Sequence, residues 1–360
     1  MGLLRRIARA RLAGQVIKRL RRAGLHDVRY DARGFQVRFT GDGDDVPTIL
    51  ELAPLLATRG RRRRDQVDRY VAGLLLRPDV PHTWADARPL LRPVLRGCTP
   101  GTPLRRPVLP FLSEFVVVDQ PDTMAYVAKE QLAAWGVVAD EVFAAARANL
   151  SAAVLRGVAT EPVVVQFMDD GDAYWTSHLL LEHWLERLAG QVGGVPVAFA
   201  PERGTLLVTA DGSDHLGGLF ARAEEIFTTS ARPITPMAYA SDDQGCTQPY
   251  AAPPGHPLHA VVRRAECLLA VREYTRQAEA LRDVEPRPDA AVAELRLVGS
   301  AEEGWRTRAI WEHDGPVLLP AADEVLVGDR IRPWAEVAPR LTVAAGFDPI
   351  RWTADRRPAP

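Results

Sequence analysis

Acidic side chains follow two segments that the sequence predicts to be strands. Asp119 comes after the segment 115–118, and Asp169, Asp170 and Asp172 form a turn after the segment 162–168. Loops at strand ends often hold binding and catalytic residues. Together with Asn149 and an arginine, these carboxylates could form an enzyme site for a phosphorylated or nucleotide-like substrate.

The three aspartates of this turn also have a structural interpretation. In a turn from a strand into a helix, carboxylates accept hydrogen bonds from the free N–H groups of the first helical turn. The turn lacks the alternating acids and the distal glutamate of a calcium-binding EF-hand loop. A weak Mg²⁺ site would need only one or two carboxylates beside a substrate phosphate. We favour the structural interpretation and predict no metal and no cofactor.

His178 and His183 lie in a segment that is predicted to be a helix over residues 176–189. Zinc-binding histidines of a comparable motif lie four residues apart, because four residues return to the same helix face. Five residues rotate the chain by about 500°, so the two side chains should diverge. The pair therefore predicts no zinc site.

Motifs for nucleophilic catalysis and phosphate binding are absent from the sequence. It contains neither a GxSxG segment nor a GxxxxGK[ST] loop. Arg96 lies near Cys98 and could lower the pKa of its thiol, but no histidine is close in the sequence. Cys267 falls on the apolar face of a predicted helix, where we expect it to pack in the core.

Basic residues are concentrated in the first third of the chain. Residues 1–110 hold 23 arginines and lysines against 10 aspartates and glutamates, a balance of +13. Residues 111–360 hold 22 against 36, a balance of −14. The basic region suits a polyanionic partner, such as nucleic acid, anionic lipid or an acidic protein. The alternative is that the charges solvate the surface, or that the two regions face each other.

Two basic segments lie within residues 1–75. Arg61, Arg62, Arg63 and Arg64 open a predicted helix, and four consecutive charges cannot all share one helix face. Residues 3–23 predict an amphipathic helix with arginines between its apolar positions. This helix could lie on an anionic membrane, but we expect its apolar face to pack within the fold. The region lacks the interleaved aromatic residues of a surface for single-stranded nucleic acid.

Length and composition are those of a globular protein. A chain of 360 residues corresponds to about two or three domains. The cysteines Cys98, Cys246 and Cys267 are far apart and odd in number, which favours a reducing compartment, the cytoplasm. No apolar run reaches the ~18 residues of a membrane span, and arginines interrupt every candidate signal peptide.

Hairpins mixed with helices predict an α+β protein with mixed or antiparallel sheets and packed helices in two to three domains. The expected parts are a basic N-terminal α+β domain (1–76), a proline-rich connector (77–110), a central α+β domain (111–243), a linker (244–257), and a long helix with a small β-rich domain (258–360). We also expect Asp140 to cap a helix and the last residues to form a disordered tail.

Several short motifs form a recognisable pattern over about two thirds of the chain. They include Val16-Ile17-Lys18-Arg19-Leu20, Leu91-Arg92-Pro93-Val94-Leu95-Arg96, Trp135-Gly136-Val137, Ala148-Asn149-Leu150 and Asp170-Gly171-Asp172-Ala173-Tyr174. With them, residues 14–243 resemble the YtpQ-like family of uncharacterised bacterial proteins, a domain of unknown function. The resemblance implies an α+β fold and a cytoplasmic bacterial protein, brings no assigned activity, and does not extend to residues 257–360.

Three hypotheses for the function remain open at this point. The first, which we favour, is a non-enzymatic binding or accessory protein whose partner is another protein. The second is the enzyme with scattered carboxylates, and the third is a nucleic-acid-binding protein that uses residues 1–75. Pairing of oppositely charged surfaces would also allow a homo-oligomer.

Overall fold

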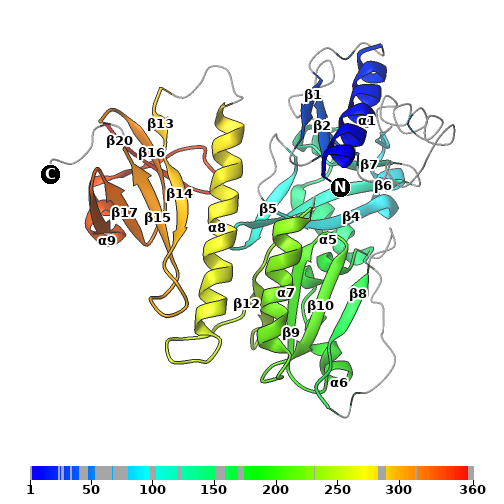
Figure 1. Cartoon of the computed structure of the whole chain (residues 1–360). Helices are drawn as coiled ribbons and strands as arrows, with labels where there is room; N and C mark the ends of the chain where they lie inside the picture. The colour runs from blue at the N-terminus through cyan, green and yellow to red at the C-terminus, as the bar shows by residue number, and fades with distance from the viewer. Residues whose placement is uncertain are drawn as a thin grey trace. The chain divides into compact units, whose positions relative to one another are not determined.

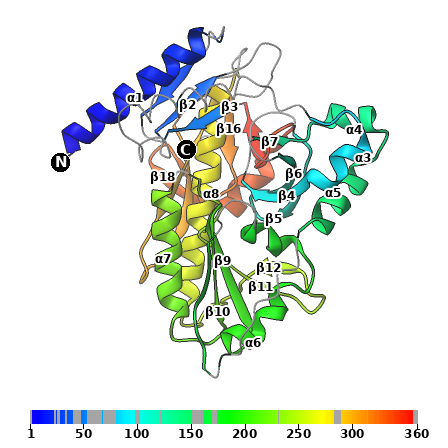
Figure 2. The same ribbon diagram turned by 90° about the vertical axis from the view of Figure 1, so that its right-hand side faces the viewer.

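A computed structural model gives the structure of the chain (Figure 1, Figure 2). It describes every residue except 1, 23–24, 26–27, 33–34, 40–47, 53–66, 68–79, 98–102, 121–122, 151–158, 160, 169–173, 231, 283–288, 313 and 356–360. Contacts between residues divide the chain into two compact units. The first contains Met1–Pro93, Thr99–Arg105 and Phe115–Leu150, and the second contains Val94–Cys98, Arg106–Glu114 and Ser151–Pro360.

The first unit begins with a helix packed on a small antiparallel sheet. The elements are α1 (Gly2–Arg22), β1 (Arg29–Asp31), β2 (Gln36–Phe39) and β3 (Thr48–Glu51), in the strand order β1-β2-β3. Leu12, Val16 and Leu20 recur every four residues on one side of α1, and they are buried in one cluster with Val37 and Leu50. The predicted amphipathic helix and its packing are confirmed.

A second sheet follows in the chain. The elements are α3 (Trp84–Ala87), β4 (Leu91–Arg96), β5 (Arg105–Leu109), β6 (Leu112–Gln120), β7 (Thr123–Tyr126), α4 (Lys129–Trp135) and α5 (Ala139–Ala148). The strand order is β4-β6-β5, and β7 pairs with β6. In the first unit, Val116 and Val118 share a buried cluster with Trp135, Val142 and Phe143. The proline-rich segment predicted as a connector therefore contributes a helix and two strands.

The start of α5 differs from the prediction. The expected N-cap, Asp140, is wrong, because Val138 holds that position. The backbone N–H of Val138 donates to Oε2 of Glu141 at 3.1 Å. A glutamate at the third helical position can satisfy this donor, so the helix starts without a polar cap residue.

A five-stranded antiparallel sheet forms part of the second unit. Its strands are β8 (Val165–Met168), β9 (Pro196–Glu202), β10 (Thr205–Ala210), β11 (Ala238–Ser241) and β12 (Thr247–Pro249), in the order β12-β11-β9-β10-β8. The helix α7 (Leu216–Thr229) packs on it, with Phe220 edge-on against Phe199 of β9. Because β12 lies within residues 244–257, the segment predicted as a linker adds a strand to the sheet.

The helix predicted over residues 176–189 is wrong. Two 3₁₀ turns (Trp175–Leu180 and Leu185–Leu188) and the short α6 (Ala189–Val192) replace it. The break includes His183, whose φ of 58° is left-handed and whose N–H donates to the carbonyl oxygen of Gly245 at 2.8 Å. A left-handed residue cannot continue a right-handed helix. The cause of this left-handed conformation is the contact of His183 with Gly245, which is distant in the sequence. The apolar spacing within residues 176–189 carries no information about such a contact.

The long helix α8 (His259–Arg282) and two four-stranded sheets complete the second unit. Their elements are β13 (Ala291–Val292), β14 (Glu294–Val298), β15 (Arg306–Trp311), β16 (Val317–Pro320), β17 (Glu324–Val327), β18 (Arg330–Pro333), α9 (Trp334–Val337), β19 (Thr342–Ala344) and β20 (Arg351–Ala354). The strand orders are β14-β15-β17-β18 and β13-β16-β20-β19. The helix α8 contacts α7 and also β14 and β15 (Figure 1, Figure 2). The predicted long helix is confirmed.

The α+β class is confirmed. Most strand pairs are antiparallel, and the parallel pairs β13–β16 and β15–β17 make the C-terminal sheets mixed. The predicted domain ranges stay predictions about which segments fold by themselves. None of the helices in the described part of the chain is long and apolar enough to cross a membrane.

Arg351 of β20 joins α8 to β16 and to the chain between β13 and β14. Its side chain is 0% exposed and donates to Gln277 Oε1 and to the carbonyl oxygens of Tyr274, Ala293 and Leu318. All four acceptors are neutral, and burial lowers the pKa of Arg351 to about 10. The guanidinium therefore stays charged at neutral pH, and it is stabilised by hydrogen bonds rather than by a carboxylate.

The expected disordered C-terminal tail is wrong for residues 351–354. These residues form β20, which pairs with β16 and β19. An arginine followed by a tryptophan and two small residues gives a weak strand signal, and the buried hydrogen bonds of Arg351 have no local signature.

Replacing Arg351 should destabilise the fold strongly. In Arg351→Leu, three backbone carbonyls and Gln277 lose their donor inside the protein, at a cost of about 3 kcal/mol. Urea unfolding should show this loss, and Arg330→Leu, at an exposed position of β18, should change the free energy of unfolding by less than about 0.5 kcal/mol. Equal effects of the two substitutions would contradict the role given to Arg351.

Tyr239 of β11 should make the protein sensitive to alkali. It is fully buried, and burial raises its pKa far above the ordinary value of 10.0. The folded state then keeps the phenol neutral while the unfolded state ionises, so the stabilisation is present below pH ~10 and is lost as the pH rises above it. Above that pH, the wild type should lose about 1.4 kcal/mol more per pH unit than Tyr239→Phe, as measured by urea unfolding; parallel pH profiles would contradict this.

Candidate functional site

Two of the predicted site residues lie in the first unit and have different roles. Asp119 is half-buried in β6, opposite Met124 of β7. Asn149 follows α5, and its Nδ2 donates to the carbonyl oxygens of Arg88 at 2.7 Å and Leu91 at 3.0 Å. This amide fastens the end of the helix to the chain before β4. No hydrogen bond or ion pair joins Asp119 to Asn149.

The other predicted site residues fall outside the described part of the chain. These are Asp169, Asp170 and Asp172 of the acidic turn, Arg61, Arg62, Arg63 and Arg64 of the arginine run, and the candidate nucleophile Cys98. Their proposed roles stay predictions.

The two histidines have different surroundings, but the segment is not the helix on which their divergence was predicted. His178 is fully buried, with its ring between Trp175 and Trp184 at centroid distances of 5.2 and 4.9 Å. His183 is 59% exposed, and its Nδ1 lies 2.9 Å from Oε2 of Glu186. Among the described residues, no three histidines, cysteines or acids come together as a metal site.

Cys267 of α8 packs in the core, as the sequence indicates. It is 1% exposed, and burial raises the pKa of its thiol to about 11. A nucleophilic cysteine needs a lowered pKa, because the thiolate is the reactive form. Cys267 is therefore poorly suited to catalysis.

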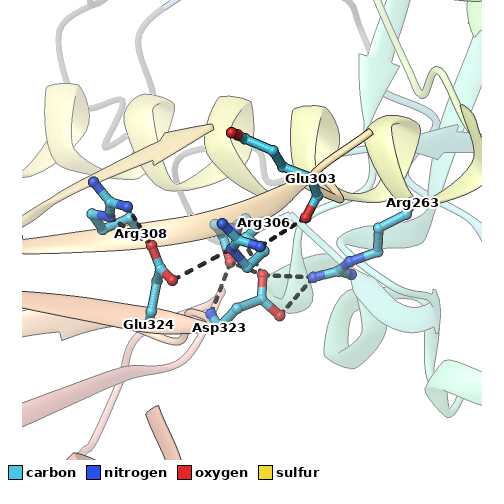
Figure 3. A network of polar contacts seen from close by, with 7 residues as sticks. Arg263, Glu303, Arg306, Arg308, Asp323 and Glu324 are labelled. Carbon is cyan, nitrogen blue, oxygen red and sulfur yellow. Dashed lines mark hydrogen bonds and ion pairs between the residues drawn. The ribbon is translucent and has the colours of Figure 1, made fainter. Parts of the chain in front are cut away.

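An ion-pair network joins α8 to the start of β17 (Figure 3). Nη2 of Arg263 lies 2.6 Å from both carboxylate oxygens of Asp323. Oδ2 of Asp323 also accepts from the N–H and the hydroxyl of Thr307, each at 2.7 Å. The carboxylate of Asp323 is thus held by three donor groups on two elements.

A second part of the network lies across β15 and β17 (Figure 3). Arg308 donates to Glu324 at 2.6 Å, and Nε of Arg306 lies 3.4 Å from the same carboxylate. Nη1 of Arg306 donates to the carbonyl oxygen of Glu303 at 3.0 Å. Because the carboxylates of Asp323 and Glu324 are each paired with at least one arginine, this arrangement holds the elements together and leaves neither carboxylate free as an acid or base.

The solvent side of α1 carries basic residues that, unlike the arginines of the ion-pair network, have no partner among the described residues. Arg11, Lys18, Arg21 and Arg22, together called the basic face, are exposed. They are spaced so that they lie opposite the buried side, and none makes a hydrogen bond or ion pair with a described residue. The first 26 residues contain no aspartate or glutamate to neutralise them. Four positive charges that have no described partner, on one face of a helix, attract anions.

Other basic residues of α1 are engaged within the protein. The guanidinium of Arg9 lies 4.7 Å from the centre of the Phe35 ring, and Arg19 donates to the carbonyl oxygen of Gln15 at 3.3 Å. The basic face therefore contains only some of the basic residues of this helix. Both the arginine run at 61–64 and residues 3–23 were predicted as basic segments, and the lack of acids before Asp27 together with the spacing of the apolar residues indicated α1.

Comparisons with known proteins add no assignment to these sites. No protein-family model matches the chain, and no significant match was found among curated proteins or among solved structures. The resemblance to the YtpQ-like family is not tested by these comparisons and stays a prediction.

The pair Arg263–Asp323 should contribute measurably to stability. These side chains are 31% and 36% exposed, so solvent screens their attraction, and a double-mutant cycle with Arg263→Gln and Asp323→Asn should give a coupling energy of about 1 kcal/mol. The control pair Arg222–Glu225 is 58% and 63% exposed and should couple by less than about 0.5 kcal/mol. Equal coupling energies would show that the network adds nothing beyond an ordinary surface pair.

Proposed function

We propose that this chain is a non-enzymatic binding protein whose first unit binds a negatively charged macromolecule through the basic face of α1. The proposal rests on a contrast between arginines that are paired with carboxylates and basic residues that have no partner among the described residues. The arginines of the α8 network are paired with carboxylates at 2.6 to 3.4 Å. Arg11, Lys18, Arg21 and Arg22 have no such partner among the described residues.

The packing of α1 supports electrostatic binding rather than insertion into lipid. A helix that lies in a membrane interface needs its apolar side free for the acyl chains. In α1, Leu12, Val16 and Leu20 are at most 1% exposed because they pack in the core of the first unit. Along residues 8–22, whose side chains the structure describes, the polar side remains available to a partner.

The described site residues support the non-enzymatic part of the proposal. The side-chain amide of Asn149 donates to two backbone carbonyls, and the thiol of Cys267 is buried with a raised pKa. A protein partner with an acidic surface and a reducing, cytoplasmic location belong to the same proposal. Cys246 and Cys267 are free thiols, which fits such a location.

Binding to immobilised heparin, a sulfated polysaccharide, tests the proposal. Arg11→Gln/Lys18→Gln/Arg22→Gln removes three charges from the basic face, each worth about 1 kcal/mol near an anionic surface. The affinity should therefore fall about a hundredfold, with no change in the circular dichroism spectrum because the three side chains are exposed.

A variant with the same change in net charge provides the control. Arg187, Arg330 and Arg340 are exposed in the second unit, and replacing all three by glutamine should leave heparin binding within about twofold of wild type. Equal losses in the two triple variants would mean that net charge, and not the face, drives binding. Turnover of a substrate in a metabolite screen would contradict the non-enzymatic part.

A further inference from the structure

Gly14 lies in the middle of α1 and on its solvent side. It is exposed, and a Cβ added there would have no atom within 4 Å. Glycine inside a helix lowers its stability relative to alanine, because it gives the unfolded chain extra freedom. Close packing and a left-handed conformation are the usual reasons for a glycine, and neither applies here, since α1 runs through Gly14 without interruption. The open space at Gly14 leaves room for the close approach of another molecule.

Gly14 lies among the residues of the basic face. Arg11 precedes Gly14 by three residues, while Lys18 and Arg21 follow it by four and seven, which are the spacings of neighbours on one helix face. From Arg11 to Arg22 the face extends about 16 Å along the axis. Phosphates of one strand recur about every 3.4 Å of rise along the duplex axis, so a face of this length can contact several of them.

The residue types on this side favour a duplex over other polyanions. A surface for single-stranded nucleic acid stacks bases on aromatic side chains, and α1 contains none. Protein interfaces depend on large anchors such as tryptophan, tyrosine and arginine in pockets, and between residues 8 and 22 no large apolar side chain is exposed. A convex helix of about 10–12 Å diameter instead matches the ~12 Å width of a major groove.

We infer that α1 binds the phosphate backbone of a nucleic-acid duplex through its basic face, with Gly14 as the point of closest approach. The inference rests on the proposed function and names its partner. Contacts to phosphates alone carry no sequence information, so binding is independent of base sequence and weakens with salt as counterions return to the backbone.

Fluorescence anisotropy with a DNA duplex of about 25 base pairs tests this in the full chain at several salt concentrations. Four phosphate contacts predict a slope of log affinity against log salt of about −3.6. Arg11→Gln/Lys18→Gln/Arg22→Gln should flatten the slope by about 3, while the control variant Arg187→Gln/Arg330→Gln/Arg340→Gln keeps it. Single-stranded DNA of the same sequence should bind at least about tenfold more weakly, for want of stacking side chains.

Two substitutions at Gly14 separate close approach from helix stability. Gly14→Ala and Gly14→Leu should both raise the melting temperature, because both residues favour the helix over glycine. Alanine should keep duplex affinity within about threefold, whereas the leucine side chain should block the phosphate and lower the affinity about tenfold. Equal duplex affinity of Gly14→Leu and wild type would overturn the role of Gly14.

The same chain tested on other probes distinguishes this inference from the proposed function. Binding to heparin without binding to the duplex would overturn the inference and leave the proposed function standing. Tighter binding to phosphatidylserine vesicles or to polyglutamate than to the duplex would also overturn it. Failure to bind heparin and the duplex alike would remove both.

Discussion

The burial of one side of α1 constrains what the rest of the first unit can do. Leu12, Val16 and Leu20 enter the core with the small sheet, and this fixes the rotation of the helix about its axis. Arg11, Lys18, Arg21 and Arg22, on the opposite side, are exposed to solvent. A helix free in solution could present either side to a partner, whereas the packed helix presents the basic one along residues 8–22.

The second unit is organised around α8, which exchanges polar contacts with the strands on one side and with α7 on the other. Arg351 donates to the carbonyl oxygens of Tyr274 in α8 and Leu318 in β16, and Arg263 pairs with Asp323 beside β17. On the side of α7, Arg264 forms a forked pair with Glu224. These charged pairs connect secondary-structure elements, whereas the basic face of α1 has no hydrogen-bond or ion-pair partner among the described residues.

Local patterns predicted much of this fold. The apolar spacing over residues 3–23 identified α1, and the long helix expected from residue 258 is α8. Two of the failures have a common cause. The left-handed His183 depends on Gly245, and β20 depends on the buried bonds of Arg351; both are contacts between residues far apart in the chain, which periodicity does not contain.

The candidate site was less predictable, because a charged residue looks the same in the sequence whether it is paired or free. Arg263 and Lys18 both occupy helices, but only the fold shows that Arg263 meets Asp323 from 60 positions away. The basic face of α1 could be narrowed down only by combining the apolar spacing with the absence of acids before Asp27. The arginine run at 61–64 was the more conspicuous basic segment in the sequence, and its role stays a prediction.

Amine acetylation followed by mass spectrometry tests the central claim most directly, because the chain has only two lysines. Lys18 belongs to the basic face, and Lys129 is exposed at the start of α4, so Lys129 serves as an internal control. If α1 is the binding surface, adding heparin or the DNA duplex should slow acetylation of Lys18 and leave that of Lys129 unchanged. Unchanged acetylation of Lys18 while the polyanion is bound, or equal protection of both lysines, would contradict the account.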